Sequence, residues 1–374
     1  MLENKTKIAT EEWLFLLCYG VWFFFCCLYF TRYRSILPIA KIHNFTCWIS
    51  LPLMIIMLIA RRRSFSVQGC LLAAAFIAIS VMVAVTTGSV KIPAYCMWIV
   101  AASYTDKKRI LRVSFWVMLV CVILTVGAAY LQIIPDKVRI TPLRFRRELG
   151  YRYPSYCSHH ILILSMLFIA IRGRIRFPEM LLLLAANYIV YRATDTRADF
   201  AIALVILPAL FLWQYLKFDL SSNVLAVLAA SVPVLMAAGS IALHYFYDEE
   251  NTLHLVLNKM LSGRLEQGKF ALNYYSFLLF GQKLSRFIDE KYSFVDNYFL
   301  RALLKNGLPF LLFILSGCAK AIFRFCKKHE KALLLAMFGM LLHGLIDPEF
   351  GDIRWDPFIF YVSSLFEERW DTAS

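Results

Sequence analysis

Residues 13–30 have the sequence WLFLLCYGVWFFFCCLYF, which contains no charged side chain. An α-helix of about 20 apolar residues crosses the hydrocarbon core of a bilayer. This stretch therefore predicts a membrane-spanning helix, which ends at the charged turn TRYR of residues 31–34. The run is long and has no clear small-residue cleavage site, so we do not expect it to be an ordinary cleaved signal peptide.

The composition of the chain extends this conclusion to its whole length. Of the 374 residues, 60% are hydrophobic and 17% are charged. Soluble domains contain about 45–50% apolar and about 25% charged residues. The sequence therefore predicts an all-α fold with a single membrane domain over residues 1–374, a polytopic bundle of about 12 transmembrane helices.

The predicted spans are residues 13–31, 38–60, 67–87, 90–104, 110–134, 157–171, 179–192, 199–216, 223–246, 302–321, 332–346 and 357–367. Five of them, those beginning at 90, 157, 179, 332 and 357, are short for a full crossing. Half-inserted helices, or helices shielded by their neighbours, are the alternative for these five.

Charge in the connections predicts which side each one faces. Short basic connections occur at residues 61–63, 107–112, 172–176 and 320–331, with Lys217 between them. Excess Lys and Arg marks cytoplasmic loops, so both termini are expected in the cytoplasm. The alternate connections carry mixed charge, and residues 247–297 are expected to form a long extracytoplasmic loop that does functional work.

Net charge and cysteines exclude other classes. The formal charge of +15 sits in short loops, where the positive-inside rule and anionic lipid account for it. No soluble module remains to bind nucleic acid. The ten Cys lie mainly in apolar stretches without a CxxC pair, so neither a disulfide framework nor a metal cluster is expected.

Two arginine segments could bind an anion on the outer side. The first comprises Arg144, Arg146, Arg147 and Arg152, where the positive-inside rule gives no reason for basic charge. Contact with lipid phosphates is the alternative to a specific anionic partner. The second is Arg197 at the start of a predicted span, whose planar fork suits a phosphate. A structural pair with a neighbouring aspartate is its alternative.

Two further segments fall in or beside the long outer loop. Arg264 follows Gly263, a residue type that lets backbone approach a ligand closely. A local pair with Glu266 is the alternative for Arg264. Asp296 precedes Asn297 near a predicted helix start, where it could cap the helix or accept a proton from a substrate hydroxyl.

Histidines give weaker signals. His159 and His160 are adjacent, so on a helix their side chains point about 100° apart and a shared metal site is not expected. His343, Asp347 and Asp352 could form a polar pocket near the outer end of a span. The sequence contains no metal-ligand spacing, P-loop or GxSxG motif.

Asp296 and Asn297 are followed by nine residues and Gly307, then by Leu308, Pro309 and Phe310. This pattern resembles a motif of bacterial O-antigen ligases and the related O-antigen and capsule polymerases, in which His occupies the position of Asp296. The segments around Arg197 and Arg264 are similar to two Arg-bearing motifs of that family. Residues 150–155 resemble its aromatic-Pro-Asn turn, with Ser155 in place of Asn.

The resemblance covers residues 150–307 and implies a multi-pass glycosyltransferase of the bacterial cytoplasmic membrane. The implied reaction joins undecaprenyl-diphosphate-linked repeat units on the outer face, without a metal or other cofactor. Implied partners are membrane lipids and the flippase and chain-length regulator of the same pathway. The site expected from residues and resemblance together has catalytic Asp296, Arg197 and Arg264, and substrate-binding residues Arg152, Asn297, Arg147 and His343.

Two alternatives remain open on the sequence. An O-antigen-ligase-like transferase would use the same chemistry on another acceptor, and no lipid A partner can be inferred. A lipid-linked oligosaccharide flippase or other transporter is the rival of a different class. Transporters often have internal repeats and charges at the membrane midplane, whereas this chain shows no repeat and its charges cluster at the outer edge.

Overall fold

The computed structural model describes residues 2–60, 65–103, 105–141, 144–216, 219–284 and 294–367. The basic turn at residues 61–63 and Lys217, both used above to assign sides, lie outside these ranges.

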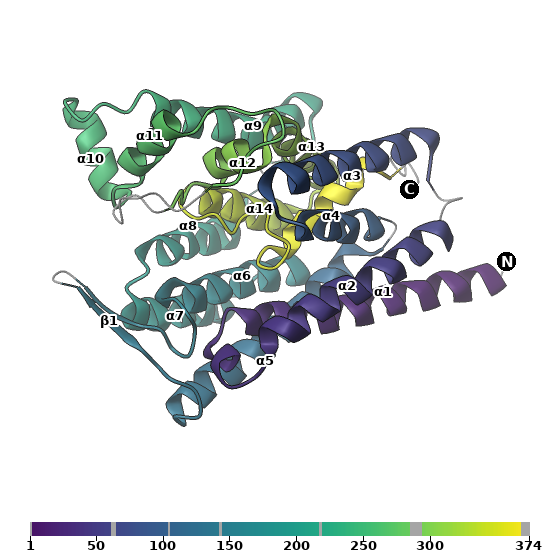
Figure 1. The fold of residues 1–374 in the computed structure, drawn as a ribbon, viewed down its shortest axis with the longest axis horizontal. Coiled ribbons are helices and arrows are strands. Elements are labelled where there is room, and N and C mark those ends of the chain that lie inside the picture. Colours follow the sequence, from purple (N-terminus) through teal and green to yellow (C-terminus); the bar gives the residue numbers. More distant parts are fainter. Residues whose placement is uncertain are drawn as a thin grey trace.

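The described chain is predominantly helical (Figure 1). Its first half contains α1 (Leu2–Tyr29), η1 (Arg32–Ser35), α2 (Ile39–Ala60), α3 (Val67–Thr87), α4 (Lys91–Ala101), α5 (Lys107–Tyr130), β1 (Val138–Thr141), β2 (Arg144–Arg147) and α6 (Pro154–Arg172). Its second half contains α7 (Phe177–Thr194), α8 (Arg197–Trp213), α9 (Asn223–Tyr245), α10 (Thr252–Met260), α11 (Arg264–Tyr274), α12 (Tyr298–Asn306), α13 (Leu308–Lys327), α14 (Lys331–Gly344) and η4 (Pro357–Leu365).

Seven of the described helices are long and apolar enough to cross a bilayer: α1, α2, α3, α5, α6, α9 and α13. The chain is therefore a multi-pass membrane protein, but the prediction of about 12 spans is wrong. The predicted spans that are not among these seven helices include α4 with 11 residues, α14 with 14, and η4, a 3-10 helix of nine residues.

These shorter segments are apolar because they are buried inside the protein. Ten of the 14 residues of α14 are buried, and the helix packs against α6 and α8. In η4, eight of nine residues are buried, and it packs against α13. An apolar segment of 10–14 residues is typical of a core helix as well as of a partial span, so hydropathy alone could not separate the two.

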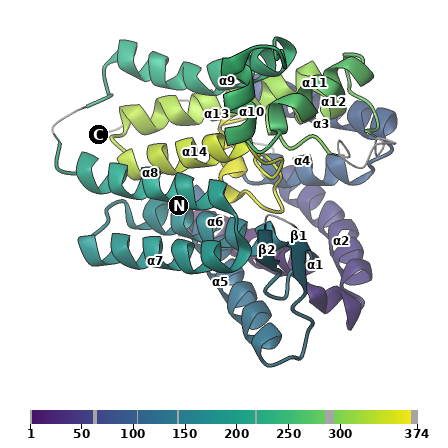
Figure 2. The same cartoon turned by 90° about the vertical axis from the view of Figure 1, so that its left-hand side faces the viewer.

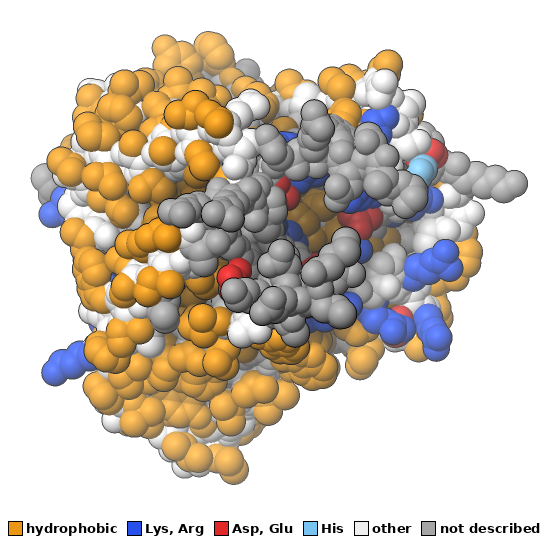
Figure 3. Space-filling model, turned by 90° about the vertical axis from the view of Figure 1, so that its right-hand side faces the viewer, with side chains coloured by type: hydrophobic (Ala, Val, Ile, Leu, Met, Phe, Trp, Pro, Cys, Tyr) orange, Lys and Arg blue, Asp and Glu red, His pale blue; other side chains and the backbone are white. Residues whose placement is uncertain are grey.

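Burial distinguishes central from peripheral spans. In α6, 78% of the span is buried inside the protein, whereas in α3 only 22% is. Peripheral helices expose large apolar side chains such as Leu71, Val85 and Val227. Broad areas of hydrophobic side chains on the face shown in Figure 3 match such a lipid-facing surface.

The basic helix ends meet at one end of the molecule. Lys107 at the start of α5 and Arg324 near the end of α13 both pair with Glu367, at 2.6 and 3.2 Å. Lys108 pairs with Glu330 at 2.7 Å. The two chain ends lie on one side of Figure 1, and the β-hairpin and α10 lie on the other.

The opposite end contains structure that the sequence did not predict. Strands β1 and β2 form an antiparallel hairpin with Thr141 opposite Arg144. Within residues 247–297, α10 and α11 form short helices beside this end (Figure 2). The segment predicted as a loop is therefore partly helical in its described residues.

Gly307 separates α12 from α13, where the sequence predicted one span over residues 302–321. Its φ is +83°, and a Cβ built there would lie 2.0 Å from the carbonyl oxygen of Leu279. Only glycine tolerates this conformation and this close approach. The break makes α12 a separate short helix with its own orientation.

Candidate functional site

A cavity of about 900 Å³ opens among the helix ends near the hairpin. Its lining comes from α4, β2, the first two turns of α6, the first turns of α8 and α11, helix α12, the start of α13, and the segment 346–355. Three residues predicted from separate parts of the sequence, Arg197, Arg264 and Asp296, all line it. The fold thus brings the three predicted catalytic residues to one cavity.

Arg197 is positioned by the turn between α7 and α8. Helix α7 ends at Thr194, and its C-cap residue Asp195 has a left-handed φ of +47°. Arg197 is the first residue of α8, and its Nε lies 3.4 Å from Asp195 Oδ1. Its side chain is 67% exposed, so the pair with Asp195 leaves most of the guanidinium open to a ligand.

Arg264 and Asp296 face each other across the cavity wall. Arg264 is the first residue of α11, and its Nε lies 3.4 Å from Asp296 Oδ2. Burial raises the pKa of Asp296 to about 6, although the charge of Arg264 opposes that rise. Arg264 thus has a long-range carboxylate partner in Asp296, whereas the sequence had offered the local Glu266 as its alternative partner.

Helix α12 contributes cations that sequence reasoning missed. Tyr298, Arg301, Ala302 and Lys305 all line the cavity, and their spacing places them on one helical face. Arg301 Cζ lies 4.3 Å from the ring centroid of Phe294. Burial lowers the pKa of both cations, and within the described residues neither has a carboxylate within ion-pair distance.

Helical periodicity could have found this face. The remaining positions of α12 include Phe299, Leu300 and Leu304, which are buried on the opposite side. The predicted span over residues 302–321 began in the middle of α12. The cavity-facing side and the buried apolar side of this short helix were therefore not recognised.

The arginines in and after β2 differ in whether they face the cavity. Arg144 and Arg146 line the cavity, whereas Arg147 and Arg152, predicted to bind substrate, do not. Alternate residues of a strand point to opposite faces, which separates Arg146 from Arg147. Arg147 pairs instead with Asp136 at 2.6 Å.

Two other predicted substrate-binding residues also lie outside the lining. Asn297 is the N-cap of α12 and donates from Nδ2 to Ser240 Oγ at 2.7 Å and to Leu345 O at 2.8 Å. It positions α12 and does not face the cavity. His343 is fully buried behind His159, which does line the cavity.

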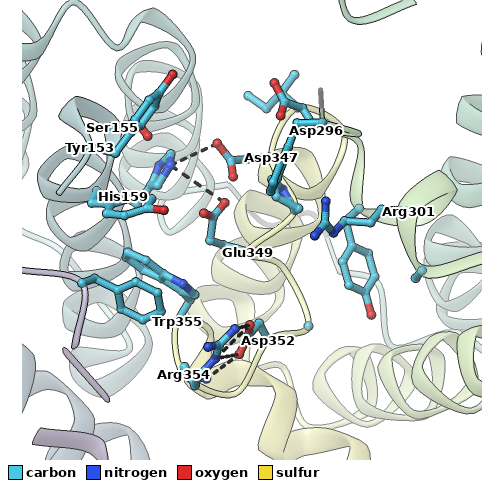
Figure 4. A pocket seen from close by; sticks show the side chains of 18 of the residues that line it. Tyr153, Ser155, His159, Asp296, Arg301, Asp347, Glu349, Asp352, Arg354 and Trp355 are labelled. Carbon is cyan, nitrogen blue, oxygen red and sulfur yellow. Dashed lines mark hydrogen bonds and ion pairs between the residues drawn. The ribbon is translucent and has the colours of Figure 1, made fainter. Parts of the chain in front are cut away.

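The segment 346–355 forms the floor and one wall. Arg354 makes a bidentate ion pair with Asp352, with Nη2 at 2.5 Å from Oδ2. This pair neutralises Arg354, unlike Arg301 on the facing wall (Figure 4). Trp355 and Tyr156 have ring centroids 5.0 Å apart and give the wall an aromatic surface.

The fold also brings together ligand-type atoms where the sequence showed no metal-ligand spacing. One atom each from His159, His343 and Asp347 lie within 4.8 Å of one another. Adjacent His160 points away and bonds through Nδ1 to the hydroxyl of Tyr151 at 3.0 Å. The rings of His159 and His160 therefore point in different directions, as the sequence predicted. The histidine beside His159 in space is His343, which is far from it in the sequence.

No protein-family model matches this chain, and no curated protein matches it.

Proposed function

We propose that this chain is a membrane glycosyltransferase that polymerises a bacterial surface polysaccharide from lipid-diphosphate-linked repeat units. The observation that carries the proposal is the cavity face of α12, where two partly buried cations, Arg301 and Lys305, have no carboxylate within ion-pair distance among the described residues. Withdrawing a cation from water without a counter-charge close by costs free energy. A diphosphate would supply that counter-charge.

Helix ends add to the positive potential. Arg197 begins α8 and Arg264 begins α11, so two helix N-termini and their arginines adjoin one cavity. Helix N-termini present free N–H groups and favour anions. Together with the α12 cations, they suit the charge that develops on a departing lipid diphosphate.

The acceptor hydroxyl needs a proton acceptor. In the proposed step, the acceptor oxygen attacks the anomeric carbon of the donor, and the bond from that carbon to the diphosphate oxygen breaks. The hydroxyl proton passes to the carboxylate of Asp296, and lipid diphosphate leaves. A pKa of about 6 makes Asp296 a stronger base than an ordinary Asp, whose pKa is about 3.9.

Cavity size and aromatic lining suit an oligosaccharide. Ligand pockets commonly measure about 300–1,000 Å³, and this cavity is at the upper end at about 900 Å³. Tyr153, Tyr156 and Trp355 offer ring faces on one wall. The cavity opens near the hairpin and α10, which we place on the outer face of the cytoplasmic membrane, where flippase and chain-length regulator would be partners.

Deleting the gene and analysing the lipid-linked glycans tests this function. A polymerase predicts that single repeat units accumulate on the outer face and that long polymer is lost. Units retained on the inner face would instead indicate a flippase. Long polymer that stays on its lipid carrier would indicate an O-antigen-ligase-like transferase.

A further inference from the structure

His159 is oriented by a carboxylate behind it. Its Nδ1 lies 2.8 Å from Asp199 Oδ2, and both residues are buried. This contact fixes the ring and directs Nε2 toward the carboxylates of Asp347 and Glu349 (Figure 4). Nε2 lies 3.0 Å from Asp347 Oδ2 and 3.9 Å from Glu349 Oε2.

A second imidazole, His343 of α14, lies on the Nδ1 side of the His159 ring, and one ligand-type atom each from His159, His343 and Asp347 still lies within 4.8 Å of the others. His343 Nε2 lies 3.2 Å from His159 Nδ1 and 3.3 Å from Asp199 Oδ1. Helices α6, α8 and α14 and the segment after α14 therefore converge on one group of nitrogen and oxygen atoms.

Four of these buried atoms make no hydrogen bond of acceptable geometry with the described residues: His159 Nε2, Asp199 Oδ1, His343 Nδ1 and Glu349 Oε2. Asp199 Oδ1 nevertheless lies within ion-pair distance of His343 Nε2. Most buried polar atoms in proteins have a partner, so such a concentration calls for an explanation. The oxygen of Asp347 is close to His159 Nε2 but does not satisfy hydrogen-bond geometry with it. Adjacent ligands of one metal ion also stand about 3 Å apart, without a linear N–H···O arrangement.

We propose that His159, His343, Asp347 and Glu349 form a binding site for one divalent transition-metal ion, with Asp199 orienting His159. Two imidazoles among the ligands favour Zn²⁺ and similar ions over Mg²⁺ or Ca²⁺, which prefer oxygen. Metal-bound histidines usually donate their other ring N–H to a carboxylate, as His159 can to Asp199. An ion would also neutralise carboxylates that neutral imidazoles leave uncompensated.

This inference is independent of the proposed glycosyl transfer, because metal binding is measured without substrate. The competing explanation is a buried imidazolium of His159 paired with Asp199 and Asp347. That arrangement needs no ion and predicts no stoichiometric binding.

The test is a titration of full-length protein, purified in detergent and stripped with a chelator, with Zn²⁺ and separately with Co²⁺. The proposal predicts one tightly bound ion per chain, a rise in Tm on adding Zn²⁺, and visible Co²⁺ absorption bands. His159→Gln should abolish these signals. Asp199→Asn should weaken binding about 10–100-fold, as expected for the loss of an orienting partner.

His329→Gln is the matched control, because that exposed histidine pairs with Asp219 at 3.0 Å and lies outside the cluster. It should bind Zn²⁺ as the unaltered protein does. If His159→Gln does not fold, Glu349→Gln takes its place, and the unaltered protein is decisive by itself. Absence of a bound ion in the unaltered protein, or undiminished binding in the folded variant, would overturn the proposal.

Discussion

Asp296 combines two properties that a general base needs. It lines the cavity, and burial raises its pKa to about 6. The helix cap that the sequence offered as its alternative role belongs to the next residue, Asn297, whose side chain accepts from Leu300 N at 2.9 Å. Capping therefore does not account for Asp296.

The first prediction follows from this separation of roles. Asp296→Asn removes the proton acceptor while keeping nearly the same shape, so chain growth should slow about 10²–10⁴-fold. Asp296→His should restore part of the rate, since an unperturbed imidazole has a pKa of about 6.5. Polymer length and protein level are measured in cells. Asp136→Asn is the control, because Asp136 lies outside the cavity lining and pairs with Arg147. Normal polymer from Asp296→Asn would remove the base role.

A second prediction concerns pH. The base acts only when deprotonated, so kcat/KM should rise with pH up to about 6, the pKa of Asp296, and level off above it. The charge of Arg264 lowers that pKa, so Arg264→Ala should move the inflection to higher pH as well as reduce the rate. A pH–rate profile of the purified enzyme measures both effects. An inflection unchanged by Arg264→Ala would show that another group titrates.

At the scale of elements, α12 is the helix on which the account depends. It is nine residues long, its N-cap is Asn297, and Gly307 ends it. One face packs Phe299, Leu300 and Leu304 inside the protein, while the other presents Arg301 and Lys305 to the cavity. The same short helix therefore contributes to the core and to the site.

The third prediction tests the cavity face of α12. Arg301→Ala and Lys305→Ala should each raise the concentration of lipid-linked donor needed for half-maximal rate, because each removes a cation without a carboxylate partner among the described residues. We expect a change of about tenfold or more, since hydrogen bonds to charged groups contribute about 1.5–3 kcal/mol. Arg147→Ala removes an arginine outside the lining and should leave donor binding unchanged. Equal effects of all three substitutions would argue for nonspecific electrostatics.

The helices show how far hydropathy alone could predict the membrane spans. The apolar runs of α1, α3 and α9 predicted spans because lipid contact demands apolar side chains along the whole helix. Helices α14 and η4 also need apolar side chains, because they are buried within the protein. Hydropathy alone therefore predicted too many spans.

Some residues of the candidate site could be predicted from the sequence, and others could not. Arg197, Arg264 and Asp296 were predicted from local motifs, and all line one cavity. His159 and His343 were not recognised as a pair because they are 184 positions apart, a separation that no spacing rule covers. Arg147 was assigned to substrate although strand alternation, which was not predicted, points it elsewhere.

At the scale of the whole molecule, the two ends differ in character. Basic helix ends pair with a few glutamates at the end near Lys107 and Glu367. The cavity, the hairpin and α10 belong to the other end. That the cavity end faces outward stays a prediction from the positive-inside rule.

The fourth prediction tests that orientation by cysteine labelling. Met260 is 75% exposed at the end of α10, so Met260→Cys should react with a membrane-impermeant reagent in intact cells. Arg174→Cys, in the turn between α6 and α7, should react only after permeabilisation. The unaltered protein corrects for its ten native cysteines. The reverse labelling pattern would place the cavity on the inner face and exclude outer-face polymerisation.

The most direct measurement combines purified protein in liposomes with a defined undecaprenyl-diphosphate-linked repeat unit and nothing else of the pathway. The account predicts a ladder of two, three and more repeat units, with one undecaprenyl diphosphate released for each new linkage. Both products should be lost in Asp296→Asn and reduced in Arg301→Ala. Folded protein that releases no lipid diphosphate and joins no units would contradict the central claim.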